Sequence, residues 1–289
     1  MSFIDDAKAV ATMPVPGGGT PDDQRRMFDA LPVAELASLW RALQNIGLRD
    51  QTGGIWATAL YFDAMPHEQP ERALGLVLNI IEMETDIAVL LQLGGKLTTS
   101  LAHVHGAALI ERLEHEAADN ARLRWLLGCS HWWAPTNELK ARFAAIADIE
   151  GWNAAETAHA ERNPPIDFGG LSVAQLAQLW IEQNSLPNKD RDRNFFAMRD
   201  FESELRSDDP ERALVMICEI LKIEANMNML SFLAAGLLED LIGMDTIDMV
   251  EREAKANDRF KMLLGGVWYH NEPDELKGRL DDILQGAHW

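Results

Sequence analysis

The sequence predicts an all-α protein made of two tandem, homologous helical-bundle units, an arrangement like that of α-helical repeat proteins. Two observations carry this prediction. Hydrophobic residues form 47% of the 289-residue chain, and they recur at the spacing of amphipathic helices, without the sustained two-residue alternation of strands. The second half of the chain also repeats the motifs of the first half in the same order, which is typical of two copies of one domain.

The internal repeat is clearest where short stretches coincide. Residues 210–214 are identical to residues 70–74, and residues 251–254 match residues 114–117 at three of four positions. The offset falls from 140 positions in the first match to 137 in the second. We therefore expect one net deletion of three residues in the second copy, between residues 241 and 251.

The most informative stretch is residues 230–268, of which residues 93–131 are a weaker copy. Its apolar residues share one helical stripe: Leu230, Leu233, Ala234, Leu237, Leu238 and Leu241. The small side chains in this stripe allow a second helix to approach closely. Trp40 and Trp180 occupy equivalent places on another stripe, so both are expected in the core.

Prolines and glycines divide the chain into four parts. We assign residues 1–30 to an N-terminal arm, 31–150 to the first unit, 151–170 to a linker and 171–289 to the second unit. Within the second unit, Asp209 precedes Pro210 and is a good N-cap. Gln69 stands at the equivalent place in the first unit, so that helix should be less well capped by roughly 1 kcal/mol.

A spaced set of residues in the second copy forms a recognisable pattern: Ala234-Ala235-Gly236, Leu238-Glu239-Asp240-Leu241, Glu251, Ala254, Phe260, Leu264 and Val267-Trp268. This pattern resembles a bacterial helical domain family of unknown function. The family pattern is Ala-Ala-Gly-Pro-Leu-Glu-Asp-Leu-Leu, then His-Gly, a Glu and Val-Trp. The second copy has Leu237 at the proline and lacks the His-Gly pair. The first copy keeps His105-Gly106 but has Gly94-Gly95-Lys96 and Thr99-Ser100 where the other motif should be. The resemblance implies a helical fold and a bacterial origin, and it implies no activity.

The composition favours an acidic cytoplasmic protein. A formal net charge of −20 attracts basic partners and repels nucleic acid and anionic membranes. The chain has no apolar run of the ~18 residues that a membrane span needs, and its start does not read as a secretory signal. Cys129 and Cys218 lie in apolar surroundings, which is typical of buried free thiols in a reducing compartment.

Acidic residues around the second copy's main stretch, together with one tryptophan, are the candidate partner-binding residues: Glu239, Asp240, Asp245, Asp248, Glu251 and Trp268. If their helices pack face to face, the carboxylates of Glu239, Asp240 and Glu251 converge. Paired carboxylates can do acid–base work or hold a metal ion. The alternative is a set of ion pairs with neighbouring helices, for instance through Arg252 or Arg259. We favour ion pairs, because Thr99 and Ser100 replace Glu239 and Asp240 in the first copy.

The first copy carries a group of histidines: His103, His105, His115 and His131. Their spacing does not match a zinc-binding motif. Cys129 and His131 are two residues apart, so on a helix they would diverge and not form a catalytic pair. We therefore predict no metal ion, no cofactor and no catalytic residue.

Three classes of function remain open. The first is a non-enzymatic module that binds a basic protein, such as a bacterial immunity protein that neutralises a basic toxin or effector. The second is a metal-binding or hydrolytic helical enzyme that uses the carboxylates or histidines named above. The third is a structural homo-oligomer, for instance a homodimer that exchanges its N-terminal arms.

Overall fold

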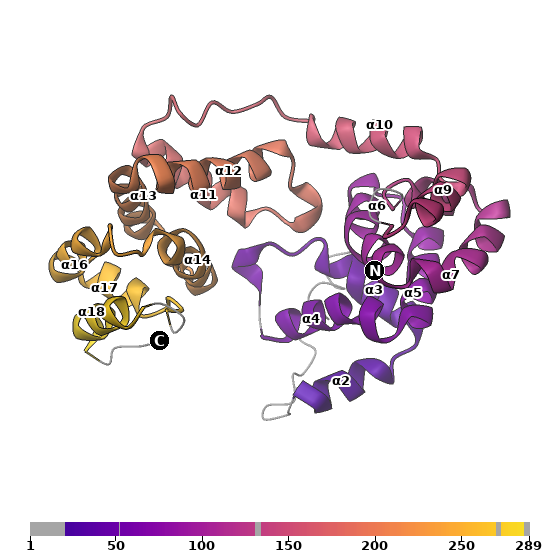
Figure 1. Cartoon of the computed structure of the whole chain (residues 1–289), viewed down its shortest axis with the longest axis horizontal. Coiled ribbons are helices and arrows are strands. Elements are labelled where there is room, and N and C mark those ends of the chain that lie inside the picture. The colour runs from indigo at the N-terminus through magenta and orange to yellow at the C-terminus, as the bar shows by residue number, and fades with distance from the viewer. Residues whose placement is uncertain (1–20, 52, 131–133, 270–272, 286–289) are drawn as a thin grey trace. The chain divides into compact units, whose positions relative to one another are not determined.

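The structure is a computed structural model, and it describes residues 21–51, 53–130, 134–269 and 273–285. All regular elements in these ranges are helical (Figure 1), which confirms the predicted all-α class. Residues 1–20 of the predicted arm, and His131, lie outside the described ranges. Contacts divide the chain into two compact units. Unit 1 holds Met1–Ile46, Gln51–Arg162 and Pro187–Asp190, and unit 2 holds Gly47–Asp50, Asn163–Leu186 and Arg191–Trp289.

Unit 1 is a bundle of short and medium helices. In chain order they are α2 (Pro21–Asp29), α3 (Val33–Leu43), α4 (Gly53–Glu68), α5 (Pro70–Met83), α6 (Ile87–Leu93), the π-helical turn η2 (Gly94–Thr98), α7 (Thr99–Asp119), α8 (Ala121–Leu127), α9 (Asn137–Ile146) and α10 (Ile149–Ala160). The short 3-10 turn η3 (Asn188–Asp190) also belongs to this unit.

Unit 2 repeats most of this order. It contains the 3-10 turn η1 (Leu48–Asp50), α11 (Val173–Ser185), α12 (Arg193–Asp208), α13 (Pro210–Ile223), α14 (Met227–Leu233), the π-helical turn η4 (Ala234–Leu238), α15 (Glu239–Leu241), α16 (Ile247–Ala256), α17 (Asp258–Leu264) and α18 (Asp274–Leu284).

The helix boundaries keep the repeat register. From α4 to η2, each element of unit 1 has a unit 2 counterpart whose bounds lie 140 positions later. Both units even place a π-helical turn at the same position. Unit 1 then continues as the single long helix α7, whereas unit 2 breaks between α15 and α16. The predicted three-residue deletion falls at this break, and the two-unit architecture is confirmed.

Thr246 stabilises the chain at that break. Its Oγ1 donates a hydrogen bond to the Leu241 carbonyl oxygen at 2.6 Å and accepts one from the Gly243 amide at 2.9 Å. These bonds satisfy backbone groups that a continuous helix would have paired internally. Unit 2 therefore loses a helical turn here without leaving those two groups unpaired.

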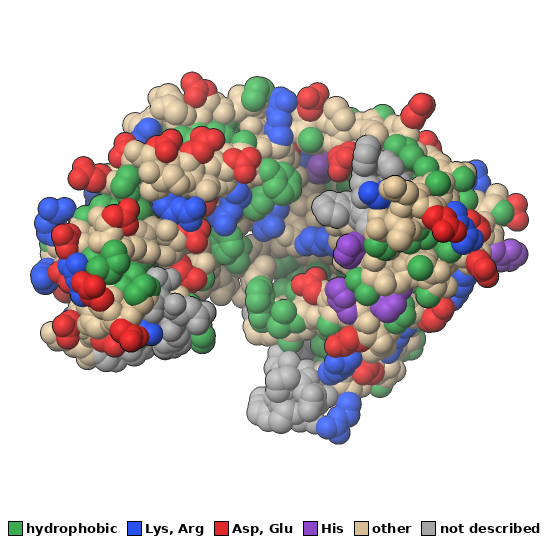
Figure 2. All heavy atoms as spheres, in the orientation of Figure 1, with side chains coloured by type: hydrophobic (Ala, Val, Ile, Leu, Met, Phe, Trp, Pro, Cys, Tyr) green, Lys and Arg blue, Asp and Glu red, His purple; other side chains and the backbone are tan. Residues whose placement is uncertain are grey.

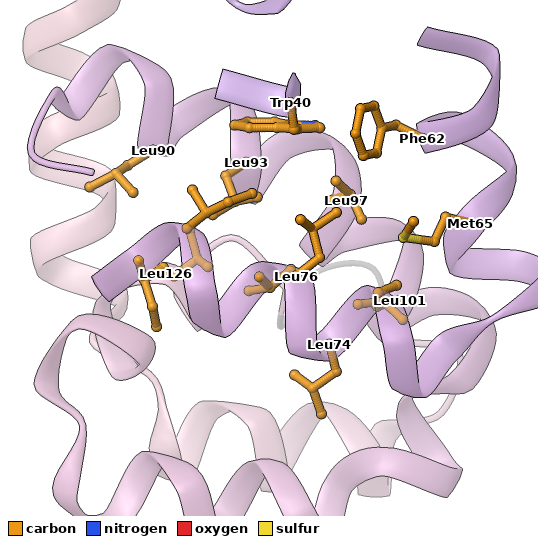
Figure 3. Packing of buried hydrophobic residues seen from close by; sticks show 14 of the residues in the cluster. Trp40, Phe62, Met65, Leu74, Leu76, Leu90, Leu93, Leu97, Leu101 and Leu126 are labelled. Atoms are coloured by element: carbon orange, nitrogen blue, oxygen red, sulfur yellow. The ribbon is translucent and has the colours of Figure 1, made fainter. Parts of the chain in front are cut away.

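Each unit has its own hydrophobic core. Trp40 is 3% exposed and Trp180 is 1% exposed, which confirms that both tryptophans are core residues. Figure 3 shows the unit 1 core, in which Phe62 lies beside Trp40 and above the leucines of α5, α6 and α7. The apolar stripe predicted for residues 230–241 is buried in the unit 2 core.

The cap difference between the units is also confirmed. The Asp209 side chain accepts a hydrogen bond from the Arg212 amide at 3.0 Å at the start of α13. The Gln69 side chain accepts no capping hydrogen bond from a backbone amide at the start of α5.

A glycine is required at the start of the first π-helical turn. A Cβ built on Gly94 would lie 2.2 Å from the Trp152 ring and 3.2 Å from the Cys129 Sγ. The Trp152 ring, carried by α10, therefore packs directly on the backbone of η2. The first ten residues of the predicted 151–170 linker thus lie in a helix of unit 1, and the boundary between the units falls after Arg162.

One continuous helical run, Ile87–Asp119, is long and apolar enough by composition to cross a membrane. Half of its most apolar window is buried inside the protein. The core helix of a soluble protein meets the same criterion, so this run adds little to the question of a membrane.

Candidate functional site

The inner face of α12 carries a glutamate where a core residue is expected. Phe195, Met198 and Leu205 follow each other at helical spacing and are buried. Glu202 occupies the fourth place in this stripe and is only 5% exposed. A carboxyl group so deeply buried is uncommon unless it is paired or has a function.

Glu202 is only partly compensated. Its Oε2 accepts a hydrogen bond from Arg199 Nη1 at 2.9 Å, whereas its buried Oε1 has no hydrogen-bond partner. Burial raises the pKa of Glu202 to about 7, although the Arg199 charge acts in the opposite direction. Glu202 therefore changes its charge near neutral pH.

A second ion pair lies near the first. Arg206, one turn further along α12, pairs with Asp240 of α15 at 2.6 Å, and the Asp240 charge adds to the rise in the Glu202 pKa. The Arg199 guanidinium in turn stacks over the Phe232 ring, 5.0 Å from its centroid. We call these four charged residues, Arg199, Glu202, Arg206 and Asp240, the unit 2 charge cluster.

Unit 1 has no such cluster. The equivalent positions hold Ala59, Phe62, Pro66 and Ser100. Phe62 is 3% exposed and packs in the apolar core beside Trp40 (Figure 3). The same backbone position is therefore an apolar core residue in one copy and a buried acid in the other.

The outer face of α12 is also distinctive. Phe196 is 59% exposed, and Asp200, Glu204 and Asp208 follow it at four-residue intervals, all of them exposed. Residues four apart on a helix are neighbours on its surface. We call this row, Phe196, Asp200, Glu204 and Asp208, the α12 acidic strip.

The partner-binding residues predicted from the sequence make separate contacts and do not form one cluster. Glu239 Oε2 accepts a hydrogen bond from the Trp268 backbone amide at 3.1 Å. Asp240 pairs with Arg206 in the charge cluster, so it belongs to a different contact. Trp268 itself is 66% exposed, and Asp245 is exposed in the loop after α15.

Asp248 and Glu251 share one arginine of α18. Arg279 contacts Asp248 at 2.6 Å and Glu251 at 2.9 Å, and it lowers the pKa of Glu251. The arginines that hold these acids are thus Arg206 and Arg279. Arg259, one of the two partners suggested from the sequence, instead donates to the Glu224 carbonyl oxygen at 2.9 Å.

The Glu251 ion pair has a counterpart in unit 1. Arg142 of α9 donates to both carboxylate oxygens of Glu114, at 2.8 and 2.7 Å, and lowers the pKa of Glu114. Glu114 and Arg142 lie 137 positions before Glu251 and Arg279. A pair found in both copies at the same place between helices is best explained as part of the scaffold.

The histidines of unit 1 do not converge within the described residues. His103 and His115 are exposed, and His105 Nε2 lies 3.2 Å from the His67 carbonyl oxygen. The described part of the chain contains no group of three or more His, Cys, Asp or Glu residues that is arranged to hold a metal ion.

The two cysteines are poor nucleophiles. Both are free, and Cys129 is buried while Cys218 is half-buried. Burial raises the pKa of Cys129 to about 11 and that of Cys218 to about 12. Because the thiolate is the reactive form, the raised pKa values keep both thiols mainly protonated, and so poorly nucleophilic, at neutral pH.

The sequence contained a signal for the charge cluster that our sequence-based interpretation missed. Glu202 interrupts the stripe formed by Phe195, Met198 and Leu205, and it lies 140 positions after Phe62. An acid that replaces an aromatic core residue in the repeat register marks an unusual site. Only this comparison of Glu202 with Phe62 would have suggested looking for a partner of Glu202 such as Arg199.

The fold and these sites define a class: an all-α protein of two homologous units, of which one carries a buried charge cluster that the other lacks. The chain belongs to DUF6869, a family of unknown function, which matches residues 44–151 and 184–288. The two matched regions correspond to the two copies, as the resemblance implied. No curated protein and no solved structure matches the chain.

Proposed function

We propose that this protein is a non-enzymatic binding module for a basic protein, and that it engages this partner through the α12 acidic strip. The observation that carries the proposal is the combination of exposed Phe196 with three exposed acids on one helix face. Aromatic anchors surrounded by polar residues are typical of binding hot spots. Acidic side chains around the anchor would steer a basic partner towards it.

The rest of the surface supports the same partner chemistry. The chain has a formal net charge of −20, and acidic side chains are spread over the face shown in Figure 2. Asp240, Asp248 and Glu251 are engaged by arginines of the same unit. The described residues show no ion pair for Asp200, Glu204 or Asp208, so these acids remain available to a partner.

A protein that neutralises a basic toxin or effector is the specific form of this proposal. Such a partner would be encoded close to the gene of this protein. Its association should be fast at low salt and slower above roughly 0.15 M ionic strength, because salt screens exposed charges.

Affinity purification from the source organism tests the proposal. The bait is the full chain, compared with an Asp200→Asn/Glu204→Gln/Asp208→Asn variant. A control, Glu35→Gln/Glu111→Gln/Glu138→Gln, removes the same charge from exposed positions of unit 1. We expect the wild type and the control to retain a Lys- and Arg-rich protein that salt releases, and the α12 variant to lose it. Equal retention by all three baits, or no basic protein among those retained, contradicts the proposal.

A further inference from the structure

Unit 1 contains a solvent-open pocket between the corner that joins α5 to α6 and helix α8, which we call the α5–α8 pocket. Its volume is about 370 Å³, within the roughly 300–1,000 Å³ typical of small-molecule sites. Of the described residues that line it, Ile81, Ile87, Leu90 and Trp125 are large and apolar, and only Thr85 and Arg122 are polar. The lining therefore suits a molecule with an apolar body and one polar end.

Arg122 is the only charged residue in this lining. Its Nη2 donates a hydrogen bond to the Glu84 carbonyl oxygen at the end of α5, which holds the guanidinium beside the pocket. The described part of the chain shows no ion pair for Arg122. A guanidinium has five N–H donors, so donors that Glu84 does not use can bind a ligand. Their planar arrangement matches a carboxylate.

The two acids at the α5–α6 corner are already paired with other cations. The buried Glu84 carboxylate contacts Arg41 Nε at 2.6 Å, and Asp86 contacts Lys189 Nζ at 3.0 Å. Each acid therefore has a cation of its own and leaves the charge of Arg122 uncompensated. An anionic ligand end is favoured over a cationic one at this guanidinium.

The remaining acids act on the pocket only through solvent. Glu82 and Asp119 are exposed residues near the ends of α5 and α7, and neither lines the pocket. The formal net charge of −20 is spread over the whole chain, and salt screens exposed charges more than roughly 8 Å apart at physiological ionic strength. The charge in direct contact with the ligand, that of Arg122, therefore decides which sign the pocket prefers.

Unit 2 offers a comparison at the equivalent positions. Arg259 lies 137 positions after Arg122 and donates to the Glu224 carbonyl oxygen at 2.9 Å, so this bond belongs to the scaffold of both copies. The residue before the arginine differs, because Asp258 replaces Ala121. A carboxylate at this place opposes an anionic ligand. We therefore expect binding in unit 1 and not in unit 2.

We propose that the α5–α8 pocket of unit 1 binds a small monocarboxylic acid. The ligand carboxylate contacts the Arg122 guanidinium, and the aliphatic or aromatic body of the ligand packs on Trp125, Ile87 and Leu90. This inference goes beyond the proposed function and does not depend on it, since the α12 acidic strip belongs to the other unit and binds a basic protein.

Fluorine NMR of the full chain labelled with 5-fluorotryptophan tests the pocket directly. A Trp125→Phe variant assigns the Trp125 resonance. The probe is 4-phenylbutyrate, and the comparison ligands are 4-phenylbutyramide and 4-phenylbutylamine, which keep the apolar body but end in a neutral or a cationic group. We expect the carboxylate to shift the Trp125 resonance with an affinity at least about fivefold higher than that of either comparison ligand, because only it forms a charge-assisted hydrogen bond with Arg122.

Two variants with matched controls locate the binding site. Arg122→Gln should weaken the affinity at least about fivefold, whereas Arg259→Gln makes the same change in unit 2 and should leave it unchanged. Ala121→Asp gives unit 1 the acid of unit 2 and should also weaken it, whereas Asp258→Ala should not. Because an acid in the first turn of a helix is stabilising, Ala121→Asp is expected to fold.

Several outcomes would overturn the inference. They are a Trp125 resonance that does not move, equal affinity for the carboxylate and the amide or amine, and an affinity that neither Arg122→Gln nor Ala121→Asp reduces. Affinity lost only in the unit 2 variants would place the site in the wrong copy. A shift caused by raising the protein concentration without ligand would assign the pocket to a second copy of the chain.

Discussion

Helices α4 and α12 are the same element in two copies, yet they diverged on both faces. On the inner face, Phe62 of α4 packs in an apolar core, whereas Glu202 of α12 is buried with a guanidinium beside it. On the outer face, Leu60 of α4 lines an apolar pocket, whereas Asp200 belongs to an acidic strip. This difference indicates that a position in the scaffold can change from apolar to charged when the neighbouring residues change as well.

The neighbouring changes are visible around the buried acid. Arg199 replaces Ala59 one turn before Glu202, and Asp240 replaces Ser100. A buried charge with its partner removed is strongly destabilising, whereas a complete pair can be close to neutral. The residues of the unit 2 charge cluster therefore depend on one another. We expect that moving a single residue from one copy to the other destabilises the unit that receives it.

The largest effect is expected when the acid alone is moved into unit 1. Phe62→Glu removes a buried aromatic ring and inserts a carboxyl group without an arginine beside it. We expect it to destabilise unit 1 by roughly 4–5 kcal/mol or more. Hydrogen exchange of α3–α5 amides, followed by mass spectrometry, measures this for unit 1 separately. Phe62→Leu should cost only about 1–2 kcal/mol; similar losses in both variants would contradict the argument.

The second-largest expected effect is a pH-dependent contribution of Glu202 to the stability of unit 2. Since the folded-state pKa of Glu202 is raised from 4.5 to about 7, the folded unit binds this proton more tightly than the unfolded chain. The contribution of Glu202 to stability is therefore greatest below pH 4.5 and is lost as the pH rises through 7, by up to about 3 kcal/mol. Glu202→Gln removes this dependence, so its stability relative to wild type should rise between pH 5 and 8.

Urea unfolding of both proteins at several pH values measures this difference. Glu204→Gln is the control, because Glu204 lies on the exposed face of the same helix. Its stability relative to wild type should stay constant over this range. Parallel pH profiles for wild type and Glu202→Gln would show that Glu202 titrates normally.

A smaller effect is expected when the arginine is removed. Arg199→Ala leaves the Glu202 carboxylate without its guanidinium and should destabilise unit 2 by about 2 kcal/mol at pH 8, with less effect at pH 5. Arg199→Ala/Glu202→Phe restores the unit 1 residues at both positions and should recover the loss. Thermal unfolding at the two pH values tests both variants. A double variant less stable than Arg199→Ala would contradict the proposed dependence of Glu202 on Arg199.

The smallest effect concerns the helix caps. Gln69→Asp gives α5 the capping side chain that α13 already has, worth about 1 kcal/mol. It also removes the hydrogen bond from Gln69 Nε2 to Asp29 Oδ1 and places a second carboxylate beside Asp29, so the net gain in the stability of unit 1 should be smaller than that. Asp209→Ala should destabilise α13 by about 1 kcal/mol. Exchange rates of the first-turn amides of each helix report these changes. If neither rate changes, the hydrogen bond of Asp209 contributes nothing to the difference between the units.

Much of the fold could be predicted because its signals are local. Helical periodicity, the 140- and 137-residue offsets and the Asp209 cap depend on residues close in sequence or on the repeat itself. Trp40 and Trp180 were correctly assigned to the core because they hold equivalent places on apolar stripes. The break after Leu241 coincides with the expected deletion.

The candidate site was less predictable because its contacts join distant residues. Asp240 was expected to pair with an arginine of a neighbouring helix, for instance Arg252 or Arg259. Its partner does lie on another helix, but it is Arg206, 34 positions earlier in the chain. Glu251 likewise pairs with Arg279 of α18. The spacing of charges along one helix does not show which helix packs against it, so these partners required the tertiary structure.

The sequence by itself determined the all-α class, the duplication and the Asp209 cap before Pro210, because these follow from periodicity, repetition and local sequence along the chain. Only the tertiary structure decided that Glu202 is buried beside Arg199, and that Arg122 lines a mainly apolar pocket between the α5–α6 corner and α8. Both features depend on which side chains meet across helices and on how much water reaches them. Burial and pairing change the ionisation of a carboxyl group, and no residue's own identity encodes either.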